Sequence, residues 1–185
     1  MKYLKLYESW NPLSKSDIES VRDLNSIGVV SDKELKDLKH RMGIEQMILN
    51  YDGIGGLNLI NTEFLTGLPD GLKVSGYLEL SKCINLKSLP AGLEVTGDFY
   101  LCDCINLESL PADLKVGGSL NLKGCTGLTS LPAGLKVGGY LEITGCTGLK
   151  SLPAGLEVGE GLYLTGCTAL KSLPDDLIVN GPIYR

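Results

Sequence analysis

Residues 131–151 read L-P-A-G-L-K-V-G-G-Y-L-E-I-T-G-C-T-G-L-K-S, and this stretch decides the fold because its pattern returns every 21 residues. The phrase L-P-x-x-L-x-V-x-G-x-L-x-L-x-x-C-x-x-L-x-S recurs five times from Leu68 without an insertion and begins a sixth time at Leu173. Only Phe99, Ile143 and Glu160 depart from it within the five copies. A fixed period of this length, with leucines at set offsets, is typical of a solenoid. Each coil of a solenoid buries its apolar side by stacking on its neighbours.

The alternation of residues within the quoted stretch predicts which side chains face the interior. From Leu135 to Ile143 every second residue is apolar or glycine, so a period of two turns this set inward and turns Tyr140 and Glu142 outward. Each coil is predicted to have one main strand, and Leu-x-Val is a candidate for a second, shorter strand. The repeated glycines are expected at coil corners, where the backbone needs a positive φ or a close approach.

The half-unit L-x-L-x-x-C-x-x-L-x-x-L-P resembles the leucine-rich-repeat family, which has asparagine or cysteine at the corner. The phrase G-C-T-x-L-x-S-L is similar to repeats of bacterial cell-surface leucine-rich proteins, and L-P-x-x-L to those of bacterial effectors. The resemblance covers residues 47–185 and implies a right-handed α+β solenoid with one parallel strand ladder. Because V-x-G-x-L departs from the family pattern, a horseshoe and a straighter, β-helix-like stack both remain open.

Residues 1–46 are predicted to form an N-terminal segment and a helical hairpin that caps the solenoid. The first helix is expected to end at Gly28. Ser31 and Glu34 are spaced as a capping box for the second helix, which is predicted to end at Gly43. The opening run M-K-Y-L-K-L-Y-E-S-W is similar to the start of small tailed-phage proteins.

Residues 17–42, D-I-E-S-V-R-D-L-N-S-I-G-V-V-S-D-K-E-L-K-D-L-K-H-R-M, resemble the short helical hairpin family called SHOCT. That resemblance implies a role in oligomerisation or docking. The alternative is that the hairpin only covers the apolar surface of the first coil, because the ends of solenoids need caps.

Residues 47–185 are predicted to form the solenoid, with about seven coils. The first coil is degenerate, with Thr62 in place of the cysteine, and the last is truncated. Pro182 is expected to protect the C-terminal edge, since proline denies a hydrogen bond to an incoming strand. A second copy of the chain is a candidate partner, through the hairpin or through this edge.

The charge of the chain limits its partners. The formal net charge is −5, and residues 1–46 contain eight basic and eight acidic residues, so the repeats hold the whole acidic excess. An acidic surface repels phosphate backbones, so nucleic acid is not an expected partner, whereas a protein is. The sequence also lacks an apolar run of roughly 18 residues, so no membrane contact is expected, and the opening residues predict a cytoplasmic location.

One cysteine in each repeat forms a predicted structural ladder. Its members are Cys83, Cys104, Cys125, Cys146 and Cys167. We expect buried thiols that make weak hydrogen bonds to backbone at the corner. Disulfides between coils, a metal site and a redox role for Cys102 are the alternatives, since stacked strands bring cysteines within bridging distance. No cofactor or metal is predicted, because no C-x-x-C and no histidine pair completes a ligand set with Cys102, Asp103 and Cys104.

The outward positions of the stacked strands line up into two columns, and tyrosines interleaved with carboxylates there are typical of protein-binding patches. The predicted protein-binding residues are Tyr77, Glu79, Asp98, Tyr100, Asn121, Tyr140, Glu142, Tyr163 and Tyr184. An outward tyrosine or glutamate contributes nothing to the core, so we predict a non-enzymatic protein-interaction module with an acidic, tyrosine-rich face. Two alternatives are a surface adhesin or carbohydrate binder, and a row that serves only the sheet. An enzyme is not expected, since the exposed carboxylates have no cleft.

Overall fold

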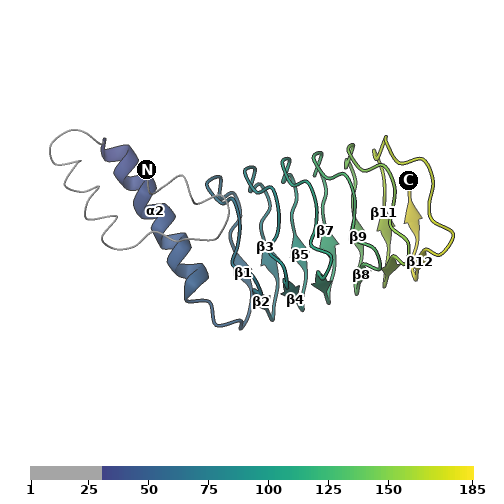
Figure 1. Cartoon of the computed structure of the whole chain (residues 1–185), viewed down its shortest axis with the longest axis horizontal. Helices are drawn as coiled ribbons and strands as arrows, with labels where there is room; N and C mark the ends of the chain where they lie inside the picture. Colours follow the sequence, from purple (N-terminus) through teal and green to yellow (C-terminus); the bar gives the residue numbers. More distant parts are fainter. Residues whose placement is uncertain (1–30) are drawn as a thin grey trace. The chain divides into compact units, whose positions relative to one another are not determined.

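The computed structural model describes residues 31–185 (Figure 1). The opening segment and the first predicted helix lie outside the described residues. The chain divides into two compact units, residues 1–52 and 53–185, and each is considered by itself.

The helix of the first unit, α2 (Asp32–Leu49), begins at the predicted capping box. The backbone N–H of Ser31 donates to Glu34 Oε2 at 2.8 Å, and the N–H of Glu34 donates to Ser31 Oγ at 3.3 Å. These reciprocal bonds satisfy amide groups that have no partner inside the helix. The predicted start of this helix is therefore confirmed.

The end of α2 differs from the expectation. The helix continues through Gly43 to Leu49, so the prediction that Gly43 ends it is wrong. The residues that follow, I-E-Q-M-I-L, contain no glycine or proline and include good helix formers, and they carry the helix onward. Asn50 forms the cap instead, with its N–H donating to the carbonyl oxygen of Gln46 at 2.9 Å.

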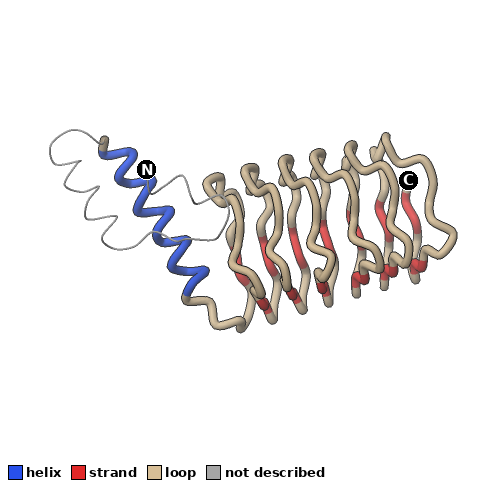
Figure 2. The backbone as a smooth tube through the Cα atoms, viewed as in Figure 1, coloured by secondary structure: helices blue, strands red, loops and turns tan. Residues whose placement is uncertain are grey.

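Residues 53–185 form a parallel β-solenoid of about six turns, with two parallel sheets on its sides (Figures 1 and 2). We call the seven-stranded one sheet A and the six-stranded one sheet B. Sheet A contains β1 (Leu57–Asn58), β3 (Leu78–Glu79), β5 (Phe99–Tyr100), β7 (Leu120–Asn121), β9 (Leu141–Glu142), β11 (Leu162–Tyr163) and β13 (Ile183–Tyr184). Sheet B contains β2 (Lys73–Val74), β4 (Glu94–Val95), β6 (Lys115–Val116), β8 (Lys136–Val137), β10 (Glu157–Val158) and β12 (Ile178–Val179).

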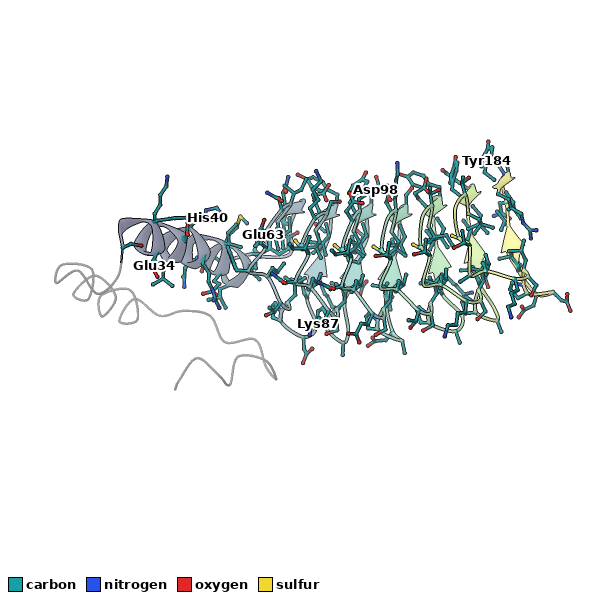
Figure 3. All side chains as sticks on the ribbon, turned by 90° about the horizontal axis from the view of Figure 1, so that it is seen from above. Glu34, His40, Glu63, Lys87, Asp98 and Tyr184 are labelled. Atoms are coloured by element: carbon teal, nitrogen blue, oxygen red, sulfur yellow. The ribbon has the colours of Figure 1, made fainter. Side chains whose placement is uncertain are left out.

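The second sheet goes beyond the single strand ladder expected from the resemblance. It is built from the Leu-x-Val segment, which the sequence identified as a candidate strand, so that part of the prediction is confirmed. Each strand pairs with the strand one repeat further on. Leu78, for example, stands in register with Leu57 and with Phe99. In two views at right angles the coils form a nearly straight row (Figures 2 and 3).

The interior of the solenoid is a continuous apolar core. Leu135, Val137, Leu141 and Ile143 are all buried, as their alternation predicts. One leucine position is filled by a larger ring, Phe99, which is fully buried. Because equivalent side chains stack coil upon coil, each buries its apolar surface mainly against its counterparts in the adjacent coils.

Glycines allow the coils to pack closely at one corner. A Cβ atom built on Gly97 would lie 2.7 Å from the carbonyl oxygen of Gly76, in the preceding coil. A Cβ on Gly181 would lie equally close to the carbonyl oxygen of Glu160. A side chain at Gly97 or Gly181 would require the neighbouring backbone to shift, so glycine favours close packing of these coils. Glu160 takes the equivalent position in one coil, so the corner does not need glycine in every repeat.

A second corner needs a left-handed backbone. Gly124, Gly145 and Gly166 have positive φ there, and the equivalent positions of the earlier coils are Asn61, Lys82 and Asp103, with φ of 58°, 62° and 58°. An L-residue in this region is strained, although asparagine and aspartate tolerate it best. The same turn is thus made with glycine in some coils and without it in others.

Candidate functional site

The two outward columns of sheet A form the candidate site. Glu79, Tyr100, Asn121 and Glu142 stand in consecutive register across the sheet, and Tyr163 and Tyr184 continue the same column. Tyr77, Asp98 and Tyr140 belong to the neighbouring column, two positions earlier in each coil. Asp98 and Tyr184 lie along one side of the solenoid, opposite Lys87 (Figure 3). The structure therefore brings the nine predicted residues to one face, which we call the sheet A face.

The tyrosines at the C-terminal end of the sheet A face touch one another. The rings of Tyr140 and Tyr163 meet edge to face, with centroids 6.1 Å apart and planes at 87°. Those of Tyr163 and Tyr184 are stacked, with centroids 4.7 Å apart and planes at 13°. Tyr184 is 48% exposed, so the row offers ring surface to solvent. Aromatic pairs in these geometries also hold one another in place.

Glycines on the same face give two of the rings room to lie against the backbone. A Cβ on Gly161 would stand 3.2 Å from Cε2 of Tyr163, and one on Gly56 would overlap the ring of Tyr77. The glycines in this column therefore leave space for these rings, and ring contacts hold Tyr163 in place. Ring positions that are fixed before binding lose little conformational entropy when a ligand arrives.

Asp98 joins the two columns and two coils. Its Oδ2 atom accepts a hydrogen bond from the Tyr100 hydroxyl at 3.0 Å, and its Oδ1 atom accepts one from the backbone N–H of Ser119 at 2.8 Å. Burial and the bond to Asp98 raise the pKa of Tyr100 to about 12. Burial, followed by the charge of Asp98, also raises the pKa of Tyr140. Both phenols are therefore neutral at physiological pH, in a negative local field.

Three residues of the candidate site have a structural task that the sequence analysis missed. Glu79 Oε1 accepts from the backbone N–H two residues later, at 2.8 Å; Glu142 Oε1 does so at 3.0 Å and Asn121 Oδ1 at 3.1 Å. Asn58 in the first coil makes the same bond at 3.1 Å. At these positions the alternative that outward residues serve the sheet has support, because the side chains satisfy amides at the end of the strand.

Tyrosine cannot accept this bond in the same way, and the coil of Tyr100 uses another acceptor. There the N–H of Cys102 donates to Ser81 Oγ, in the preceding coil, at 3.1 Å. A serine hydroxyl of the preceding coil also accepts from the N–H of Tyr140, since Ser119 Oγ lies 3.2 Å from that nitrogen. The sequence contained a signal for the acceptor role, since the column reads Asn-Glu-Tyr-Asn-Glu-Tyr-Tyr and places a side-chain acceptor at four of its seven positions.

The cysteine ladder is structural, as predicted. Each of its five thiols is buried and donates to a carbonyl oxygen 24 residues earlier, at 3.0–3.2 Å. All six cysteines are free, so the alternative of disulfides between coils is wrong for this structure. Burial raises the pKa of Cys83 to about 11 and those of Cys104 and Cys146 to about 12. A thiol with so high a pKa is protonated at neutral pH and is therefore a poor nucleophile.

Cys102 lies outside the ladder and is half-buried. Burial raises its pKa, and the nearby charges of Glu79 and Asp103 raise it further. A redox cysteine needs the opposite environment, with positive charge to stabilise its thiolate. The local field therefore does not support the redox alternative.

The outward column of sheet B has a different character. It contains Lys73, Glu94, Lys115, Lys136, Glu157 and Ile178. Here lysines pair with glutamates of adjacent coils: Lys136 Nζ lies 2.8 Å from Glu157 Oε1, and Glu94 Oε2 lies 3.6 Å from the Nζ atoms of both Lys73 and Lys115. Sheet B thus balances its own charges, whereas the strand columns of sheet A carry carboxylates without basic residues.

In the described residues no three His, Cys, Asp or Glu side chains gather as a metal site. Of the helices in residues 31–185, none has the length and hydrophobicity that a bilayer span requires. No family model matches the chain, and no curated protein or solved structure shows detectable similarity to it.

Proposed function

We propose that the chain is a non-enzymatic protein-interaction module that binds a protein partner on the sheet A face. The observation that carries this proposal is the row formed by Tyr140, Tyr163 and Tyr184, whose rings contact one another and reach solvent. These tyrosines fill no position in the apolar core. Large, rigid aromatic rings on a fixed frame supply contact area at little entropic cost, which is why tyrosine is enriched at binding hot spots.

The proposal is tested by capture of a partner from an extract of the source organism, with the full chain as bait. Replacing Tyr140 and Tyr163 with alanine should abolish capture and leave the unfolding transition nearly unchanged. The matched control replaces Glu94 and Lys136, on sheet B, with alanine. Equal capture by all three proteins would contradict the proposal, as would equal loss with both pairs of substitutions.

A second candidate is carbohydrate binding, as in a surface adhesin. It is favoured by the partly exposed rings of the row, since aromatic faces also stack on sugars. A glycan array separates the candidates: binding to a sugar that is lost in Tyr163→Ala would support this one. Six free thiols favour a reducing compartment, and we propose the cytoplasm as the location, which argues for a protein partner.

We further propose that the coil is right-handed and of leucine-rich-repeat type. The resemblance rests on L-x-L-x-x-C, and the thiol bonds to the preceding coil give the cysteine a physical reason to stand at that corner. Right-handed crossovers between parallel strands are also the general rule. A crystal structure would test both points, and a left-handed coil would contradict them.

A further inference from the structure

The two sheets of the solenoid differ in net charge. The outward columns of sheet A contain three carboxylates, Glu79, Asp98 and Glu142, and no lysine or arginine, which gives −3. The outward column of sheet B contains three lysines and two glutamates, which gives +1. Each of these lysines forms an ion pair with a glutamate of an adjacent coil. A charged partner would therefore distinguish the two faces, and a cationic one would be drawn to sheet A.

The carboxylates of sheet A stand beside the tyrosine rings. Asp98 is hydrogen bonded to the hydroxyl of Tyr100, and Glu142 is in register with Tyr163. Each glutamate gives one oxygen to a backbone amide, which holds the charged group at a fixed place while the second oxygen makes no hydrogen bond among the described residues. The negative field that acts on Tyr100 and Tyr140 would stabilise a cation at the same place.

We propose that the sheet A face recognises an extended, arginine-rich segment of a protein partner, with guanidinium groups lying over Tyr140 and Tyr163 beside Asp98 and Glu142. This inference rests on the proposed function and specifies the chemistry of the partner. Guanidinium planes stack on aromatic faces and pair with carboxylates, and arginine does both better than lysine.

The spacing of the rings suits an extended peptide. Alternate side chains of an extended chain project to the same side about 6.6 Å apart. The centroids of Tyr140 and Tyr163 are 6.1 Å apart. Two arginines at alternate positions of a peptide that runs along the row would therefore meet Tyr140 and Tyr163. Tyr163 and Tyr184 are stacked 4.7 Å apart, too close for the same match.

The test uses the full chain and a defined probe, the capped peptide acetyl-(Arg-Gly)₃-amide, with binding measured by calorimetry at low ionic strength. The same peptide with citrulline in place of arginine has nearly the same shape and no charge. We expect the arginine peptide to bind at least tenfold more tightly than the citrulline peptide, and its affinity to fall as salt is added.

Variants of the protein locate the binding site. Asp98→Asn with Glu142→Gln removes two charges and keeps the oxygens that accept the backbone bonds; we expect about a tenfold loss of affinity. Glu94→Gln with Glu157→Gln changes the net charge equally on sheet B, and we expect less than a twofold loss. Equal losses would indicate attraction by net charge alone and overturn the inference.

The outcomes also separate this inference from the proposed function. If the arginine peptide does not bind, but the tyrosine substitutions still abolish capture of a protein partner, the function stands and the cationic chemistry is wrong. If the peptide does not bind and capture is also unaffected, both fail. Preference for the citrulline peptide would likewise overturn the inference.

Discussion

The Sγ atom of Cys125 lies 3.0 Å from the carbonyl oxygen of Leu101, in the preceding coil, and donates a hydrogen bond to it. The N–H of Cys104 donates to the same oxygen at 3.2 Å. The carbonyl group thus joins the corner of its own coil to the next coil. Thr62 occupies the cysteine position of the first coil and is buried as well.

The thiol bond predicts an unusual order of stability for two isosteric substitutions. In an apolar site, a protein with threonine is less stable than the same protein with valine, because burying a hydroxyl without a partner costs about 1–3 kcal/mol. At position 125 the threonine hydroxyl can donate to Leu101, so we expect Cys125→Thr to be at least as stable as Cys125→Val in urea unfolding. Val137→Thr, in the apolar interior, is the control and should lose about 1–3 kcal/mol. A clear advantage for Cys125→Val would show that the bond contributes nothing.

The raised thiol pKa values predict a loss of stability at alkaline pH. The folded thiols of Cys83 and Cys104 ionise near pH 11 and 12, whereas unfolded thiols ionise near their usual pKa of about 8.5. Between these values the unfolded chain binds fewer protons, so the free energy of unfolding falls as pH rises. The slope is at most about 1.4 kcal/mol per pH unit for each thiol. Urea unfolding from pH 7 to 11 measures it, and Cys125→Thr should make the slope shallower; constant stability over this range would refute the prediction.

The strained corner of the second coil predicts a stabilising substitution. Lys82 has a φ of 62°, and the equivalent residue Gly145 has a φ of 76°. We expect Lys82→Gly to raise the free energy of unfolding by about 0.5–1 kcal/mol, because relief of the left-handed strain outweighs the added chain entropy. Gly145→Ala is the matched substitution, and it should lower the free energy of unfolding. No backbone atom lies closer than 3.8 Å to its Cβ, so the expected loss of about 1 kcal/mol comes from φ alone. Urea midpoints that move the opposite way would contradict this account.

Gly→Ala substitutions at Gly97, where the coils pack closely, and at Gly43, in α2, are predicted to have opposite effects on stability. Gly97→Ala would place a methyl group 2.7 Å from backbone of the preceding coil, and we expect a loss of more than about 2 kcal/mol. Gly43→Ala, inside α2, has no atom within 4 Å of its Cβ, and we expect a gain of about 1 kcal/mol in helix stability. Thermal unfolding followed by circular dichroism measures both. Similar effects from the two substitutions would mean that the coil spacing is not set at Gly97.

The period of the sequence predicted the solenoid, its inward residues and the buried thiols, because these depend only on which positions repeat. It did not predict the hydrogen bonds of Glu79 and Asp98. Those bonds depend on where the backbone amides point after each strand, which the alternation of apolar residues does not encode. The end of α2 was missed for a related reason: a glycine ends a helix only if the chain turns there, and the residues after Gly43 favour helix.

The thiol ladder also bears on how such a chain can change its length. Because each cysteine reaches a carbonyl 24 residues earlier, duplication of one whole repeat reproduces every bond between coils and adds one more of each. An insertion into a coil that is not a whole number of repeats would move a thiol away from its acceptor or shift the outward columns out of line. Tandem gain or loss of complete units is therefore the route by which this protein can lengthen or shorten its exposed face while keeping its interior intact.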